Sequence, residues 1–215
     1  MLVMILIHIE LFSLYYFLIW ERIGLIAGAE GFVILSGFVL GMVYKKRVFQ
    51  KVWRNTTFNL FSRASLLYCV NIFIITTIGL ISLIPWVNAS QVMSYTDRGS
   101  GTVYPLYPAI GTKLEIIIGQ ALSLSIGPHQ TQILGLYIFL LLLTPLALCF
   151  FSTDKTRYFL LISWIIYIFN RLYPYRLTGC QFEYAFPLLT WQLIFFHGMA
   201  AGYHRNRIAE FTRSK

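Results

Sequence analysis

Long apolar runs separated by short polar segments are the main pattern of this chain. Six runs reach or approach the ~20 residues that cross the apolar core of a bilayer: residues 2–20, 24–44, 64–86, 132–151, 158–170 and 186–203. A shorter apolar run, residues 115–125, ends at Gly127 and Pro128 and predicts an interfacial or re-entrant helix. The pattern predicts an all-α fold, a polytopic helical transmembrane bundle of about six membrane spans plus that helix. We expect one integral membrane domain over residues 1–215.

The second run combines one carboxylate with several small residues. At about 100° per residue, one face of the helix holds Glu30, Gly37, Gly41 and Tyr44. Two glycines four residues apart allow a neighbouring helix to come close in lipid, and the last run carries a second such pair, Gly198 and Gly202. Glu30 is therefore expected to face the protein, and an ionisable group within a span marks a functional site by default.

Composition supports a membrane protein. The chain is 58% hydrophobic and 12% charged, whereas soluble domains carry about 25% charged residues. A soluble protein of this composition would expose apolar surface that it could not cover.

The net charge of +9 is concentrated in a few segments. Twelve of the 17 basic residues lie in residues 45–63, 155–157 and 205–215. The positive-inside rule places all three segments, and both termini, in the cytoplasm. Attraction to anionic lipid follows from this distribution, so we expect a lipid bilayer and no nucleic acid among the partners.

Motifs for metal or cofactor chemistry are absent from the sequence. The three cysteines show neither a CxxC motif nor a spacing with histidine that would indicate a zinc site or a disulfide framework. No serine nucleophile elbow or phosphate-binding loop is present either. We therefore expect no bound metal and no bound cofactor.

His8 in the first run and Glu30 in the second are the candidate catalytic residues. A tight turn joins the two runs, and antiparallel neighbours can bring such groups within hydrogen-bond reach. A carboxylate beside an imidazole fixes its tautomer and raises its basicity, which builds a general base for acyl transfer to a hydroxyl. The same pair could serve as a proton relay in a transporter, and the residues alone do not choose between these functions.

Further polar residues lie near the ends of the runs. The candidate substrate-binding residues are Arg63, Tyr68, Gln132, Tyr137 and Gln192. Polar groups at the outer mouth of a span could line an entrance for an acceptor, or could simply begin a helix. The positive charge of segment 45–63 has two explanations: it sets the membrane topology alone, or it also forms a docking surface for a phosphate-rich donor.

Five stretches resemble the OpgC family of membrane acyltransferases, which is related to the acyltransferase-3 superfamily. They are ILIHIEL around His8, GAEGFVILSGFVLGMVY, the basic segment leading to RASLLY, ILGLYIFLLLLTPLAL, and FPLLTWQLIFFHGMAAGY. These stretches lie along most of the chain. The carboxylate followed by the F-V-x-L-S-G pattern is the most specific of them.

The resemblance implies a function at the bacterial inner membrane. Family members are thought to move succinyl groups from a cytoplasmic acyl-CoA onto periplasmic glucans. By this resemblance His8 is the base, Glu30 is its partner or an essential neighbour, and Arg63 is a candidate for binding the negative charge of the donor. The expected partners are acyl-CoA, such as succinyl-CoA, as donor substrate and a glycan as acceptor.

The chain also departs from the family pattern. Family members usually have an Arg- and Asp-containing segment before the first-span histidine, and about four further spans after a point resembling Tyr203. The alternative function is therefore a non-enzymatic membrane component: a transport subunit, a truncated remnant, or a partner that needs another membrane chain.

Overall fold

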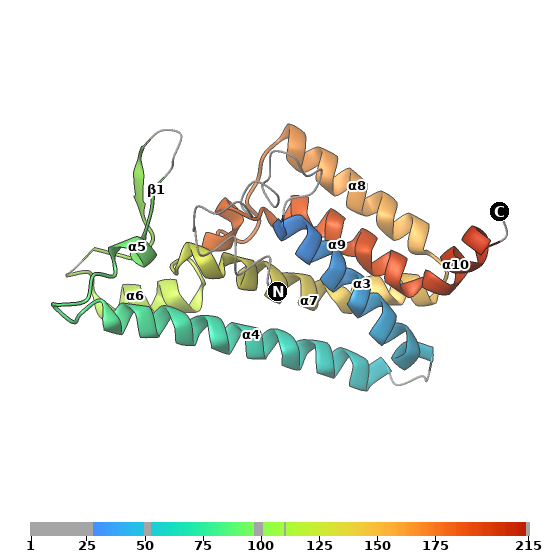
Figure 1. The fold of residues 1–215 in the computed structure, drawn as a ribbon, viewed down its shortest axis with the longest axis horizontal. Helices are drawn as coiled ribbons and strands as arrows, with labels where there is room; N and C mark the ends of the chain where they lie inside the picture. Colours follow the sequence, from blue (N-terminus) through green and yellow to red (C-terminus); the bar gives the residue numbers. More distant parts are fainter. Residues whose placement is uncertain (1–27, 50–52, 97–100, 110, 214–215) are drawn as a thin grey trace, which may run out of the picture. The chain divides into compact units, whose positions relative to one another are not determined.

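The structure is a computed structural model that describes residues 28–49, 53–96, 101–109 and 111–213. The expected first span, including His8, lies outside the described residues. The described part is mostly helical, as predicted. Its helices are α3 (Gly28–Phe49), α4 (Trp53–Ile81), α5 (Ser90–Met93), α6 (Leu114–Leu122), α7 (Gln132–Ser152), α8 (Thr156–Leu172), α9 (Leu188–Tyr203) and α10 (Arg205–Arg213), with the short 3-10 helices η1 (His129–Thr131) and η2 (Gln181–Tyr184) (Figure 1).

Two short strands correct the expectation of a purely α fold. β1 (Ser94–Thr96) and β2 (Val103–Pro105) pair antiparallel, with Tyr95 opposite Tyr104 (Figure 1). Both lie in the polar segment between the apolar runs 64–86 and 115–125. Tyr, Thr and Val favour strands, which explains why this segment forms a hairpin.

The basic segment 45–63, which separates the apolar runs 24–44 and 64–86, is helical over most of its length. α3 continues to Phe49 and α4 begins at Trp53. No glycine or proline occurs between Gly41 and Gly79, so the sequence contains no residue that would stop a helix there. α4 ends shortly before Pro85, because a proline disfavours the helical conformation of the residue before it.

Three described helices are long and apolar enough to cross a membrane: Gly28–Lys46, Trp53–Ile81 and His129–Ser152. α8 and α9 have 17 and 16 residues and are shorter than the ~20 residues that a span normally requires. The described residues therefore do not confirm six spans. α6 overlaps the short apolar run where a helix was expected; its interfacial or re-entrant position stays a prediction.

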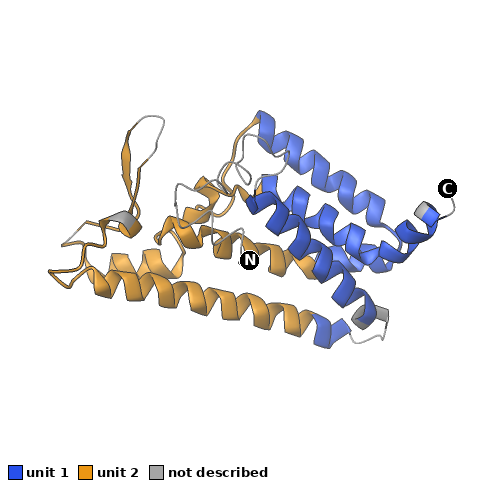
Figure 2. Cartoon of the chain, in the orientation of Figure 1, with its two compact units in different colours: residues 1–56, 146–172, 190–215 blue, residues 57–145, 173–189 orange. Residues whose placement is uncertain are grey.

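The chain divides into two compact units, each built from separate segments (Figure 2). Unit 1 comprises residues 1–56, 146–172 and 190–215, and unit 2 comprises residues 57–145 and 173–189. Each unit is described by itself below. The single membrane domain stays a prediction.

In unit 1, α3 and α9 pack closely through the two predicted pairs of glycines. A Cβ atom at any of the four glycines would overlap a backbone carbonyl of the facing helix: that of Phe195 at Gly37, Met199 at Gly41, Ile34 at Gly198 and Phe38 at Gly202. Residue numbers rise together along the two helices, which therefore run parallel (Figure 1). The predicted close approach is confirmed, and each pair of glycines is the partner of the other.

α8 buries two uncharged polar residues and exposes most of its apolar ones. Ser163 and Asn170 are buried, whereas the exposed large side chains are Tyr158, Leu161, Ile162, Trp164, Ile165, Ile168, Phe169 and Leu172. A helix of a soluble protein shows the opposite arrangement. The distribution is expected for a helix that faces lipid and joins its neighbour through polar contacts.

Hydrogen bonds between side chains connect α8 to α9. Ser163 Oγ donates to Gln192 Oε1 over 2.6 Å, and Gln192 Nε2 donates to the Ser163 carbonyl over 2.9 Å. Asn170 Nδ2 donates to Thr190 Oγ1 over 3.0 Å. These buried groups are therefore satisfied by each other, as an apolar environment requires.

Residues in or next to the three basic segments lie at one end of unit 1. Lys45 Nζ lies 5.5 Å from the ring centre of Tyr203, at the ends of α3 and α9. Arg207 Nη1 lies 3.3 Å from Oδ1 of Asp154, in the turn between α7 and α8. The segments that the charge rule assigns to one side of the membrane are thus together in the structure; which side they occupy stays a prediction.

Candidate functional site

The predicted site residues fall in both units. Glu30 and Gln192 belong to unit 1, whereas Arg63, Tyr68, Gln132 and Tyr137 belong to unit 2. The predicted contact between His8 and Glu30 lies outside the described residues and stays a prediction.

Glu30 lies in the first turn of α3 and is half-buried. A carboxylate there interacts favourably with the positive end of the helix dipole. The contacts of the four glycines fix the parallel register of α3 on α9. The same register, continued toward the helix starts, places Glu30 at the level of residues 188–194. Glu30 and Gln192 are therefore in the same layer of unit 1.

His197 provides a structural contact in unit 1. Its Nε2 must accept the hydrogen bond from Trp164 Nε1 (3.1 Å), because an indole nitrogen only donates. Its Nδ1 therefore carries the proton and donates to the Leu193 carbonyl over 2.8 Å. Both ring nitrogens are occupied, so His197 is not placed to act as a base.

In unit 2, the structure places two predicted residues in contacts with connecting segments. Tyr68 on α4 donates its hydroxyl to the Leu122 carbonyl over 2.7 Å, and so holds α4 to the end of α6. Gln132, the first residue of α7, is buried and donates through Nε2 to the Gln181 carbonyl over 3.4 Å. Tyr137 is buried five residues further along α7, whereas Arg63 is exposed on α4.

A small polar cavity of about 10 Å³ lies beside Gln132. Its polar lining consists of Asn71 from α4, Thr131 and Gln132 from the start of α7, and Gln181 from η2. Asn71, Gln132 and Gln181 are each buried. Three buried amide side chains therefore converge at this cavity.

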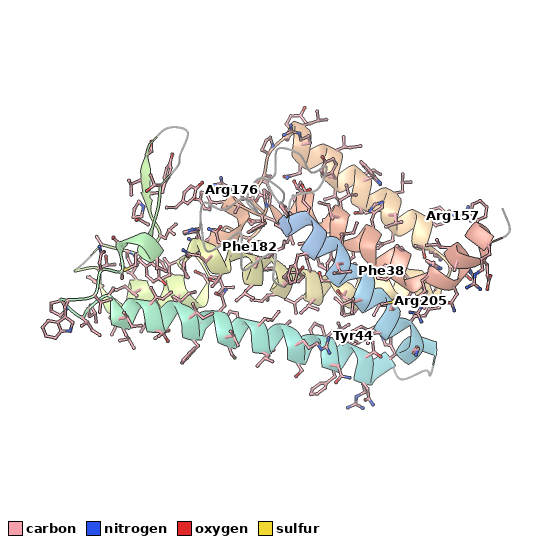
Figure 3. The ribbon with its side chains drawn as sticks, in the orientation of Figure 1. Phe38, Tyr44, Arg157, Arg176, Phe182 and Arg205 are labelled. Atoms are coloured by element: carbon pink, nitrogen blue, oxygen red, sulfur yellow. The ribbon has the colours of Figure 1, made fainter. Side chains whose placement is uncertain are left out.

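Two glycines make room for this arrangement. Gly127 has a φ of +145°, and a Cβ there would lie 3.0 Å from the Ile75 side chain. A Cβ at Gly135 would lie 2.8 Å from the ring of Phe182 (Figure 3). Glycine is therefore favoured at Gly127, where the chain before α7 packs against α4, and at Gly135, where α7 packs against η2.

Glu183 is a buried carboxylate that sequence analysis did not single out. It is 1% exposed and accepts hydrogen bonds from the backbone N–H groups of Leu177 (3.2 Å), Thr178 (2.9 Å) and Gly179 (3.3 Å). The carboxylate thus organises the loop that leads into η2.

Burial raises the pKa of the neighbouring Cys180 thiol, and the charge of Glu183 adds to this effect, so the thiol is protonated at neutral pH.

No group of three or more His, Cys, Asp or Glu side chains within the described residues could hold a metal ion. Neither the curated proteins nor the solved structures gave a match to the chain. The sequence model of one protein family, described as OpgC protein, matches residues 1–215. This match agrees with the resemblance found in the motifs and with the apolar helices of the structure. The chain belongs to the OpgC protein family.

Proposed function

We propose that the chain is a membrane-bound O-acyltransferase, or the part of one that carries its site. It moves an acyl group, such as succinyl, from acyl-CoA to a hydroxyl of a periplasmic glucan or another glycan. The observation that carries this proposal is the match of the OpgC family to residues 1–215. The exposed apolar helix faces and the three candidate spans support a site within a membrane.

The proposed reaction needs one base and no protein nucleophile. His8 takes the proton of the acceptor hydroxyl while the hydroxyl oxygen attacks the thioester carbonyl carbon. The carbon–sulfur bond then breaks, and the thiolate of coenzyme A leaves and takes the proton from the imidazolium. Glu30 orients the imidazole and stabilises its protonated form.

The remaining candidate residues have proposed roles in substrate binding. Arg63 binds a negative charge of the donor, because a guanidinium matches phosphate oxygens in charge and geometry; its exposure on α4 supports this role. Gln132 and Tyr137 bind the acceptor, supported by the position of Gln132 at the polar cavity.

The amide of Gln192 and the hydroxyl of Tyr68 already form hydrogen bonds to Ser163 and to the Leu122 carbonyl. We therefore propose that these two residues support the substrate site by holding their helices in place. In the proposed topology the protein lies in the inner membrane with both termini in the cytoplasm, where the donor is available.

The test is transfer of a labelled succinyl group from succinyl-CoA to glucan by the full chain in nanodiscs. His8→Ala and Glu30→Gln should each lower the rate, His8→Ala by about 10²–10⁴-fold. Glu115→Gln is the matched control for Glu30, because both carboxylates lie in the first turn of a helix but Glu115 is exposed. His204→Gln is the control for loss of a histidine elsewhere.

Unchanged transfer in the His8 variant, with normal insertion, would show that the catalytic assignment is wrong. A proton or substrate flux in liposomes that needs Glu30 but no acyl-CoA would instead support a transport component. Wild-type protein that shows neither transfer nor flux would favour a non-enzymatic membrane component.

A further inference from the structure

We propose that unit 2 contains a binding site for one hydroxyl oxygen in the cavity beside Gln181. The cavity lies where α4, the start of α7 and η2 meet. The structure favours this site through an unused hydrogen-bond donor, the size of the cavity and the chemistry of its lining.

The unused donor is the side-chain amide nitrogen of Gln181. This residue is only 8% exposed, and its Nε2 atom has no hydrogen-bond partner. The backbone of Gln181 is held on both sides: its N–H donates to the Leu124 carbonyl over 2.9 Å, and its carbonyl accepts from Gln132. Because a buried donor without a partner is unfavourable, a rigidly held amide in this position indicates an acceptor in the cavity.

The cavity volume limits the size of that acceptor. A volume of about 10 Å³ is close to the lower limit for one water-sized group. A complete sugar ring does not fit, whereas a single hydroxyl does. Gly127 and Gly135 line the cavity, and side chains at these positions would reduce the space further.

The lining indicates a group that both accepts and donates hydrogen bonds. Gln181 Nε2 requires an acceptor, while the carboxamide groups of Asn71 and Gln132 can offer oxygen as well as nitrogen. A hydroxyl oxygen meets both requirements. Its source is either a buried water molecule or a hydroxyl of the acceptor glycan; only the second source rests on the proposed function.

Thermal unfolding of the full chain in nanodiscs tests the site without any acyl transfer. Gln181→Met keeps the approximate shape of the side chain but removes the amide. If an oxygen occupies the cavity, this change breaks a real hydrogen bond and should lower the melting temperature by about 2–4 °C. If the cavity is dry, removal of an unsatisfied donor should raise the melting temperature, and this result would overturn the proposal.

Gln192→Met is the matched control, because both amide atoms of Gln192 are hydrogen-bonded to Ser163. The melting temperature of this variant should fall whether or not the cavity is occupied.

Added D-glucose distinguishes the two sources of the oxygen. A stabilisation of wild type by glucose that is lost in Gln181→Met assigns the site to a sugar hydroxyl. A lower melting temperature of Gln181→Met with an unchanged response to glucose assigns it to water. Since no outcome requires turnover, failure of this proposal is separate from failure of the proposed function.

Discussion

Glu183 carries a charge at a position that is 1% exposed, and three backbone N–H groups satisfy it. An amide in its place would keep one acceptor oxygen but would add N–H donors that the loop does not pair. We therefore expect Glu183→Gln to lower the free energy of unfolding by about 1–3 kcal/mol, measured by thermal or denaturant unfolding in nanodiscs. Glu115→Gln, at an exposed position, should be nearly neutral. Equal stability of the two variants would contradict a supporting role for the Glu183 carboxylate.

We expect His204 to make the stability of the protein dependent on pH. Burial lowers its pKa below the usual 6.5, Arg207 and Lys45 lower it further, and Asp154 opposes them. The unfolded chain therefore binds a proton at a higher pH than the folded chain does, and stability should fall as the pH decreases through about 6.5. Melting curves from about pH 8 to pH 5.5 measure this. His204→Gln should show a smaller decrease over the same range; an identical decrease would assign the effect to other groups.

Glu30 and Glu183, one half-buried and one buried, differ in how well the sequence indicates their unusual positions. Glu30 interrupts a long apolar run, so its unusual position is visible in the pattern. Glu183 lies in a polar segment with Arg171 and Arg176 nearby, and such segments are normally exposed. Its burial follows from the fold of the loop around the carboxylate, and the same is true of Gln181. The sequence therefore singles out Glu30 in an apolar run, whereas it gives no signal for Glu183 and Gln181, which are buried by the fold of a loop.

At the scale of elements, the α3–α9 pair depends on direct contact between backbones. We expect Gly41→Ala to be destabilising, because its Cβ would overlap the Met199 carbonyl and overpacking costs about 1–3 kcal/mol. Gly79→Ala is the matched control: a Cβ at Gly79 on α4 meets nothing within 4 Å, so alanine should be neutral or slightly stabilising there. The measurement is the melting temperature of both variants. A Gly41→Ala variant as stable as wild type would show that the helices can separate without cost.

Periodicity and small-residue spacing predicted a close helix contact at these positions, because each of the two helices carries a pair of glycines four residues apart. The same approach misplaced the start of α4. Its first turns contain the polar residues Arg54, Asn55, Thr56 and Thr57. Because the sequence analysis defined each span by its apolar residues alone, it excluded these residues and began the run at residue 64. Charged and polar residues are compatible with a helix that extends beyond the apolar region, and no breaking residue stops it.

At the scale of the whole molecule, the charge distribution and the contacts agree. The charge rule groups three basic segments on one side of the membrane. In unit 1, residues in or next to these segments are in contact at the ends of α3, α7 and α9. The rule uses the sequence only, whereas the contacts come from packing. Their agreement supports the order of the spans in unit 1. Only three of the described helices, and not six, are long and apolar enough for a membrane span.

Whether α8 crosses the membrane is therefore the decisive question for the topology. At 1.5 Å per residue its 17 residues extend about 25 Å, slightly less than the ~30 Å apolar core of a bilayer. Its exposed apolar and buried polar residues favour a lipid-facing helix in contact with α9. We expect cysteines placed at its two ends, Thr153→Cys and Leu172→Cys, to react with a membrane-impermeant maleimide from opposite sides.

The labelling should be carried out in cells and in inverted vesicles, with Cys69 and Cys149 replaced by serine because both are exposed. Thr153→Cys lies in the turn that carries Asp154 and Lys155, so the charge rule predicts reaction from the cytoplasmic side. Leu172→Cys should react from the outside. Reaction of both positions from the same side would mean that α8 lies along the membrane interface. The number of spans and the side of the membrane on which α9 begins would then have to be reassigned.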